Sequence, residues 1–214
     1  MAIKHSPRIV TDGLVVHYDA ANTKSYPGSG TAWKDLSGKG NNGTIYGATF
    51  GSGNAGKFNF DESNDYVDCG NILSQTAYTK SAWFRPESAT RNIISGPSSH
   101  AFWMDNTDNT LRAGHRGTWN RVSHTVPSGN MLNQWWNGAV TYNNSTGWVL
   151  YLNGVQVDTD SNTDDPNGTT GVYIGRYSSG NYFDGDIAEV LVYDRAITAA
   201  EVLQNYQALK ERYL

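Results

Sequence analysis

Asp184-Gly185-Asp186-Ile187-Ala188-Glu189-Val190-Leu191-Val192-Tyr193 is the stretch that decides the fold of this chain. It predicts one long apolar strand, and the Gly/Asn loop Ser178-Ser179-Gly180-Asn181 precedes it as a turn. A single amphipathic helix is expected over residues 198–213, because Thr198 and Glu201 have the spacing of a capping box. An all-β chain that closes on one long strand and one short helix has few architectural solutions.

Strand signals recur at short spacing through the rest of the chain. Residues 148–152 and 155–158 flank Asn153-Gly154, which is a strong hairpin signal because the turn needs positive φ at both residues. Strands do not alternate with helices, so we expect a sandwich of two antiparallel sheets. The other predicted strands cover residues 14–18, 44–48, 57–60, 66–68, 79–84, 135–142 and 172–176.

Composition limits the class of protein. At 214 residues, with 38% hydrophobic and 17% charged residues, the chain is expected to form one β-sandwich domain. The seven Trp and thirteen Tyr need burial or a partner, which argues against disorder. The net charge is −4 and no basic run occurs, so nucleic acid is not the expected partner.

The ends of the chain and its cysteine add three expectations. Residues 1–7 lack the apolar core of a signal peptide, and no stretch approaches the roughly 18 apolar residues of a membrane span, so we expect synthesis in a cytoplasm without membrane insertion. The only cysteine, Cys69, predicts a buried thiol and no disulfide. We expect an N-terminal arm (1–12), a sandwich domain (13–197) and a C-terminal helix (198–214) packed on the domain or on a neighbouring subunit.

Together these features resemble the laminin G-like, or concanavalin A-like, jelly-roll superfamily over nearly the whole chain. The resemblance is carried by Tyr18-Asp19, by residues 33–44, 60–67 and 148–157, and by residues 184–190 with 193–198. It implies an all-β, two-sheet antiparallel jelly-roll sandwich with one C-terminal α-helix.

A narrower resemblance concerns residues 25–33 and 201–206, which look like the stand-alone laminin G-like proteins of tailed bacteriophages, especially marine, cyanophage-type ones. It implies a virion protein that assembles in the host cytoplasm. The implied role is a capsid decoration or cement subunit, or part of a fibre, with capsid or other virion proteins as partners and a homo-oligomeric state on the particle.

The superfamily includes glycoside hydrolases, and a retaining glycosidase needs two carboxyl groups about 5–5.5 Å apart. The hydrolase branch carries Glu-x-Asp-x-x-Glu, and none of the five Glu in this chain has that spacing. Asp186 and Glu189 come nearest, but residues i and i+3 of a regular strand face opposite sides. We therefore expect no catalytic residues and no enzyme.

Relatives often hold one structural Ca²⁺, whose ligands are carboxylate and carbonyl oxygens. The resemblance implies Asp19, Asp35 and Asp186 as metal ligands, with carbonyls from residues 40–43. Two observations oppose this: Ala188 stands where relatives often have Asp, and Asp19 and Asp35 could instead cap turns. The acidic run 158–165 lacks the glycine and terminal Glu of an EF-hand and is expected to be a solvated turn.

Glycan binding needs flat apolar faces with convergent amides and guanidinium groups. Trp119 follows the polar loop 115–118, and Tyr177 and Tyr182 flank the loop that contains Asn181. These four residues with Arg116 form the candidate carbohydrate site, and packing at strand ends is the alternative. Trp103, Trp135 and Trp136 are further aromatic candidates, whereas Trp83 and Trp148 lie in apolar strands and are expected in the core.

Two functions remain open from the sequence. The first is a non-enzymatic virion structural protein, most directly a capsid decoration subunit with a lectin-like surface. The second is a carbohydrate-binding adhesin on a fibre or receptor-binding component, with cell-surface glycans as partners. The two can coexist, and glycoside hydrolysis is a distant third.

Overall fold

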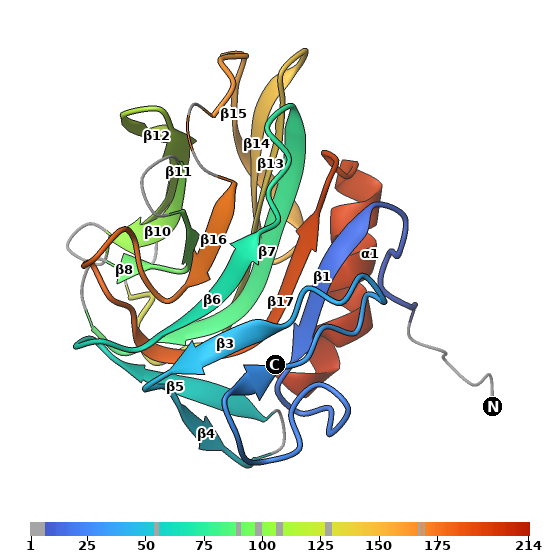
Figure 1. The fold of residues 1–214 in the computed structure, drawn as a ribbon. Helices are drawn as coiled ribbons and strands as arrows, with labels where there is room; N and C mark the ends of the chain where they lie inside the picture. The colour runs from blue at the N-terminus through green and yellow to red at the C-terminus, as the bar shows by residue number, and fades with distance from the viewer. Residues whose placement is uncertain are drawn as a thin grey trace.

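The computed structural model describes residues 7–53, 56–88, 91–96, 100–105, 109–126, 130–166, 168 and 170–214. The strands form three antiparallel sheets, and a single α-helix follows the last strand (Figure 1). The predicted fold class is therefore confirmed: an all-β sandwich of antiparallel sheets that ends in one helix. Where the domain begins and ends along the chain stays a prediction.

The largest sheet has eight strands and is organised around the stretch that decided the fold. That stretch forms β17 (Asp184–Tyr193), with β7 on one side and β5 and β1 on the other. The remaining strands of the sheet follow β7 and β5 outward to its two edges. Its members are β1 (Leu14–Asp19), β4 (Thr49–Gly51), β5 (Lys57–Asp61), β7 (Ala77–Pro86), β13 (Trp136–Asn143), β14 (Gly147–Leu152), β15 (Val155–Asp160) and β17.

Two smaller sheets form the opposite layer. One has the order β2 (Ala32–Trp33), β3 (Gly43–Tyr46), β6 (Tyr66–Asn71), β16 (Gly171–Ile174) and β9 (Ile94–Ser95). The other has the order β12 (Thr118–Thr125), β11 (Thr110–His115), β10 (His100–Asp105) and β8 (Arg91–Asn92). Strands β8 to β12 were not predicted, because frequent Gly, His, Arg and Asn residues interrupt the alternating pattern there.

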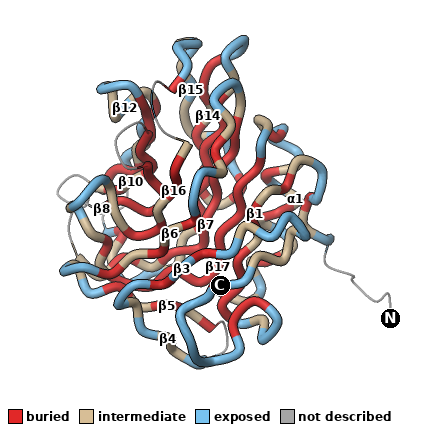
Figure 2. Tube along the Cα trace, in the orientation of Figure 1, coloured by how far each residue is buried: buried red, intermediate tan, exposed pale blue. Residues whose placement is uncertain are grey.

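The main core lies between the two layers, where Figure 2 shows the buried parts of the strands facing each other. Strand β17 contributes Ile187, Val190 and Val192, which pack in the same cluster as Phe102 of β10. Trp148 packs in this core and Trp83 in a separate cluster with the C-terminal segment, and each is 1% exposed, as predicted. Cys69 is also buried, and burial raises the pKa of its thiol to about 12, so it is not a reactive thiolate.

The outer face of the large sheet is covered by α1 (Ala199–Leu209) and the 3-10 helix η1 (Lys210–Arg212) (Figure 1). Thr198 caps α1 with a complete capping box, as predicted. Val202 packs in an apolar cluster with Leu191 of β17, and Leu209 and Tyr213 pack with Trp83 of β7. The helix thus gives the large sheet a second buried face. The part of the predicted N-terminal arm before Pro7 lies outside the described residues.

Local turn chemistry follows the sequence closely at the β14–β15 hairpin. Asn153 and Gly154 have φ of 50° and 77°, the left-handed values that this turn demands.

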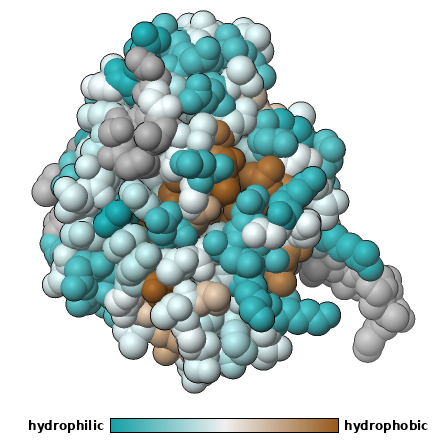
Figure 3. All heavy atoms as spheres, in the orientation of Figure 1, coloured by the Kyte–Doolittle hydropathy of each residue, from teal (hydrophilic) through white to brown (hydrophobic). Residues whose placement is uncertain are grey.

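The face of the molecule in Figure 3 is mostly hydrophilic, with its hydrophobic atoms gathered near the middle. Among the described residues, no helix has the length and apolar character needed to cross a membrane.

Candidate functional site

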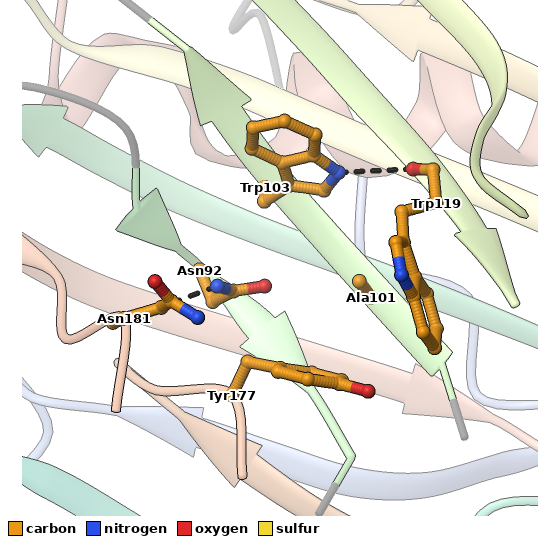
Figure 4. A pocket seen from close by; sticks show the side chains of 6 residues that line it. All are labelled: Asn92, Ala101, Trp103, Trp119, Tyr177 and Asn181. Carbon is orange, nitrogen blue, oxygen red and sulfur yellow. Dashed lines mark hydrogen bonds between the residues drawn. The ribbon is translucent and has the colours of Figure 1, made fainter. Parts of the chain in front are cut away.

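A pocket opens on the outer side of the four-stranded sheet, where it meets the loop between β16 and β17 (Figure 4). Its cavity volume is about 230 Å³. Figure 4 shows three aromatic side chains around Ala101, with two asparagines on the side away from Trp119. The described lining residues are Asn92, Ala101, Trp103, Trp119, Tyr177 and Asn181.

Strand geometry places the lining residues on one face. Ala101 and Trp103 are two apart in β10, so both point away from the core while Phe102 points into it. Asn92 of β8 is the cross-strand partner of Trp103. A Cβ at Gly114 would lie 2.0 Å from the carbonyl oxygen of Thr118, so glycine there lets β12 approach β11 closely and bring Trp119 to the pocket.

The β16–β17 loop supplies the opposite wall. Tyr177 and Gly180 form an isolated bridge, and Ser178 and Asn181 adopt left-handed φ values of 53° and 50°. Such values suit Asn and are strained for most other residues. This local turn holds Tyr177 and Asn181 against the strands, and it explains why the Ser/Gly/Asn run predicted from sequence sits at the site.

The aromatic walls are held by specific contacts. The rings of Trp119 and Tyr177 have centroids 5.2 Å apart and planes at 62°. Trp103 donates from Nε1 to the backbone oxygen of Trp119 at 2.9 Å, and the guanidinium of Arg112 lies 5.0 Å from the Trp103 ring. Burial raises the pKa of Tyr177, so its hydroxyl stays protonated at neutral pH. The rings thus form fixed apolar surfaces of the kind that sugar rings pack against.

The candidate carbohydrate residues predicted from sequence are only partly brought together. Trp119, Tyr177 and Asn181 line the pocket. Arg116 lies in the turn before β12, with its guanidinium 3.9 Å from the Asp164 carboxylate, and does not line it. Tyr182 is not among the described lining residues either; it contacts Arg176, whose pKa is raised because contacts with Tyr173 and Tyr182 outweigh the opposing effect of burial.

Sequence reasoning missed Asn92 and Ala101 and named Trp103 only as one aromatic among several. Asn92 belongs to a two-residue strand that no periodicity reveals, and Ala101 matters only because its small side chain leaves room above β10. The pairing of β8 with β10 creates the site, and no local signal encodes that pairing.

The predicted calcium ligands lie in three separate environments. Asp19 shares a site with His17 and Glu189, the one set of three or more metal-ligating side chains, among the described residues, whose ligand atoms lie within 4.8 Å of one another. Arg212 inserts between the two carboxylates, with Nη2 2.7 Å from Asp19 Oδ1 and Nη1 3.0 Å from Glu189 Oε2. We call His17, Asp19, Glu189 and Arg212 the charge cluster.

A guanidinium therefore takes the place between Asp19 and Glu189 that a metal ion would need. Glu189 is 1% exposed, lies 3.0 Å from His17 Nε2, and accepts a 3.3 Å hydrogen bond from the Tyr213 hydroxyl. Burial raises the pKa of Glu189, and the contacts with His17 and Arg212 oppose that rise. The charge cluster ties the end of the chain to β1 and β17.

Asp35 and Asp186 have their own partners. Asp35 accepts hydrogen bonds from the backbone N–H groups of His17 and Ser37, which is the turn-capping role named as the alternative. Asp186 is bound by Lys57 at 2.5 Å and by Arg85 at 2.6 Å. The three carboxylates thus do not converge, and a calcium ion stays a prediction.

A β-bulge changes one expectation about the carboxylates of β17. The register of β17 against β7 shifts between Ile187 and Glu189, so that Ile187 and Val190, three apart, both face the inner core. Asp186 and Glu189 consequently lie on the same outer face, and the expectation that they face opposite sides was wrong. Each is held by its own cations, Asp186 by Lys57 and Arg85 and Glu189 by Arg212.

The core between the sheets also contains an unexpected polar group. Lys80 is fully buried, and its Nζ lies 2.5 Å from His100 Nδ1 and 3.3 Å from the carbonyl oxygen of Ile94. Burial lowers the pKa of Lys80 well below its usual value. The strand pattern gave no warning of a lysine at an inward-facing position.

Residues 61–203, more than half of the chain, match the family model Laminin_G_3, described as the Concanavalin A-like lectin/glucanases superfamily. No curated protein sequence matches the chain.

Several solved structures share the fold at low sequence identity. Domain 4 of AbnA, a GH43 extracellular arabinanase from Geobacillus stearothermophilus, in complex with arabinotriose, is similar with a TM-score of 0.68 and 19% identity, over 90% of this chain and 98% of that one. The Trypanosoma rangeli sialidase in complex with the inhibitor DANA gives a TM-score of 0.71 and 11% identity, over 99% of this chain and 36% of the sialidase.

The binding domain of Botulinum Neurotoxin DC in complex with SialylT gives a TM-score of 0.71 and 12% identity, over 93% of this chain and 52% of that one. The chain thus spans about a third of the sialidase and half of the toxin domain, and nearly all of the arabinanase domain.

Proposed function

The chain belongs to the concanavalin A-like lectin/glucanases superfamily, and from this premise we propose that it is a lectin-like domain that binds carbohydrate in the pocket beside β10. The observation that carries the proposal is the pairing of two inclined aromatic rings, Trp119 and Tyr177, with the amides of Asn92 and Asn181 around one open cavity. The C–H face of a sugar packs on such rings, and amides hydrogen-bond its hydroxyl groups.

The similar structures add support of a limited kind. Two of them are complexes with saccharides: arabinotriose with the arabinanase domain, and SialylT with the toxin binding domain. Because these structures are less than 25% identical to this chain, the likeness concerns the fold. The proposed ligand of this chain rests on the residues of its own pocket.

We propose binding without catalysis. None of the six described lining residues carries a carboxylate, so the described lining lacks the carboxylate pair that most glycosidases use. The two carboxylates on the outer face of β17, Asp186 and Glu189, are each held by cations. A reducing-sugar assay on the glycans that bind is expected to show no hydrolysis; release of sugar would revive the hydrolase alternative.

The test of carbohydrate binding is a glycan array followed by titration calorimetry on the best ligand. Trp119→Ala removes one aromatic wall and is expected to weaken binding at least about tenfold, since aromatic stacking and its buried area are lost. Trp135→Ala is the matched control, because Trp135 packs against Tyr213 on the outer face of the large sheet, across the sandwich from the pocket. Affinity that Trp119→Ala leaves unchanged, or an array without any ligand, would contradict the proposal.

We propose a virion location separately, from the resemblance of residues 25–33 and 201–206 to stand-alone phage proteins. One observation is compatible with a neighbouring subunit: Leu203 and Leu214, in and after the C-terminal helix, are 40% and 66% exposed. In this role the domain would decorate a capsid or fibre as a homo-oligomer and display its pocket outward. Mass spectrometry and cryo-electron microscopy of the source particle test it, and absence from the particle would refute it.

A further inference from the structure

We propose that the pocket selects an uncharged sugar unit, and that buried Ser95 fixes Asn92 as a hydrogen-bond donor to that sugar. The proposal rests on the proposed function and deepens it by naming the ligand class and a positioning residue. Two independent features carry it: the absence of charge among the described lining residues, and a chain of hydrogen bonds behind Asn92.

The described lining residues present two amides, three aromatic side chains and one methyl group to the pocket. A carboxylate that enters such a pocket loses water and finds no cation, and recognition of carboxylates in proteins normally uses Arg or Lys. Uronic and sialic acids are therefore poor ligands for the inner part of this pocket.

Among the described residues, Arg112 and Arg176 adjoin lining residues in space or sequence, and both have other partners. Arg112 forms a 2.9 Å ion pair with Asp105 and packs on the Trp103 ring from outside the lining. Arg176 precedes Tyr177 directly, but its guanidinium lies 3.6 Å from the Tyr66 ring centre and 4.1 Å from that of Tyr173, away from the pocket. Neither arginine is a lining residue, so neither offers the pocket a positive charge.

Hydrogen bonds fix the orientation of the Asn92 amide. The backbone N–H of Phe102 can only donate, and it donates to Ser95 Oγ at 3.3 Å. Ser95 Oγ then directs its single hydrogen at Asn92, whose nearest atom, Oδ1, lies 2.7 Å away. The backbone oxygen of Asn181 lies 3.5 Å from the other amide atom and can only accept, so that atom is Nδ2 and the atom facing Ser95 is Oδ1.

Burial keeps these two hydrogen bonds in place. Ser95 is 0% exposed and Asn92 6% exposed, so water does not compete at Oδ1. Nδ2 makes a long contact of 3.5 Å to the backbone oxygen of Asn181, and no other acceptor among the described residues takes its second hydrogen. Asn92 thus presents a donor to the pocket, and the complementary ligand group is a neutral oxygen such as a sugar hydroxyl or ring oxygen.

The selectivity is tested with sugar pairs that differ only in charge, such as digalactose against digalacturonic acid and lactose against sialyllactose, together with neutral arabino-, xylo- and gluco-oligosaccharides. Calorimetry on the full chain at neutral pH is expected to favour the neutral member by at least about tenfold, because the carboxylate is desolvated without a partner. Equal or tighter binding of the acidic member would overturn the proposal while leaving carbohydrate binding intact. If no sugar of either kind binds, the proposed function itself fails.

The positioning role of Ser95 is tested with Ser95→Ala, which is expected to weaken binding of the preferred neutral sugar by about fivefold or more through loss of the fixed donor. Thr79→Val is the matched control, because Thr79 is also 0% exposed, also accepts a backbone N–H and also donates to a carbonyl, far from the pocket. Both variants should lose similar stability, and only Ser95→Ala should lose affinity.

A second readout separates positioning from general destabilisation. In ¹⁵N spectra, the side-chain amide of Asn92, assigned by its loss in Asn92→Asp, should shift when the sugar is added to the native protein. In Ser95→Ala this ligand-induced shift should be reduced, whereas Thr79→Val should retain it. An Asn92 amide that does not respond to the sugar in the native protein would overturn the donor assignment.

Discussion

The pocket beside β10 and the charge cluster beside β17 use polar groups in opposite ways. In the charge cluster, the Asp19 and Glu189 carboxylates meet the Arg212 guanidinium at 2.7 and 3.0 Å, and little is left for a ligand. In the pocket, the asparagines face a cavity of about 230 Å³ between aromatic walls. The same sandwich therefore has one polar region matched internally for stability and one left open for recognition.

This difference has a physical origin in the elements that cover each region. The outer face of β17 is covered by α1 and η1, which bring Arg212 to the buried carboxylates. The outer face of β10 is flanked by the short loop at residues 177–181, which reaches only its border. Burial requires that charges be paired, while an open site tolerates groups that water or a ligand completes.

The largest expected effect comes from breaking the charge cluster. Arg212→Ala leaves two carboxylates without their main cation, and we expect a loss of about 3 kcal/mol in the free energy of unfolding. Glu211→Ala changes the exposed neighbour and should cost no more than about 0.5 kcal/mol. Urea denaturation measures both, and the sugar affinity of the folded Arg212→Ala protein should be unchanged. Linked losses of stability and affinity would contradict the separation of the two regions.

The next effect is a pH dependence of stability, whereas the sugar affinity of the pocket should not depend on pH. Burial lowers the pKa of His115 to about 4 from 6.5, so the unfolded chain binds more protons between these values and stability falls as pH drops through that window. We expect the native protein to lose about 2 kcal/mol relative to His115→Gln between pH 6.5 and 4.

Sugar affinity should be constant between about pH 5 and 8. Tyr177 is the only titratable group among the described lining residues, and burial raises its pKa. Calorimetry at several pH values measures this. A titration of affinity in that range would place an ionisable group in the site and weaken the comparison.

A smaller effect is expected from the buried amine. Lys80→Met replaces a desolvated amino group with an apolar chain of similar length, and we expect a gain of about 1 kcal/mol at neutral pH. Because burial lowers the pKa of Lys80, the native protein should gain stability as pH rises toward 10.5, and the variant should lack this slope. A loss of stability in the variant would mean that the hydrogen bonds to His100 and Ile94 outweigh the desolvation of the amine.

The smallest effect concerns calcium. Since Arg212 already neutralises Asp19 and Glu189, we expect the folded state to need no ion there, and a chelator should change the melting temperature by less than about 1 °C. Differential scanning calorimetry with and without chelator measures this. A drop of several degrees would support the calcium ion implied by the resemblance and would show that the guanidinium is not the sole counter-charge.

The fold was largely predictable because its signals are local. Apolar runs such as 184–193, the Asn153-Gly154 turn and the Thr198 capping box each depend on a few neighbouring residues. Strands β8 to β12 were not predicted, since their short polar-interrupted segments are strands only through their partners. The bulge in β17, which turns Glu189 to the face of Asp186, is likewise invisible to strand periodicity.

The sequence by itself determined the sandwich class, its final strand and helix, and three of the six described residues of the candidate pocket. Trp119, Tyr177 and Asn181 were found because an aromatic ring beside a polar turn is a local pattern. Only the tertiary structure decided that Asn92 and Ala101 join them, that Arg116 and Tyr182 do not, and that Arg212 occupies the space between two buried carboxylates. Periodicity and turn chemistry act over a few residues, whereas these contacts join segments up to 193 positions apart through sheet pairing and helix docking.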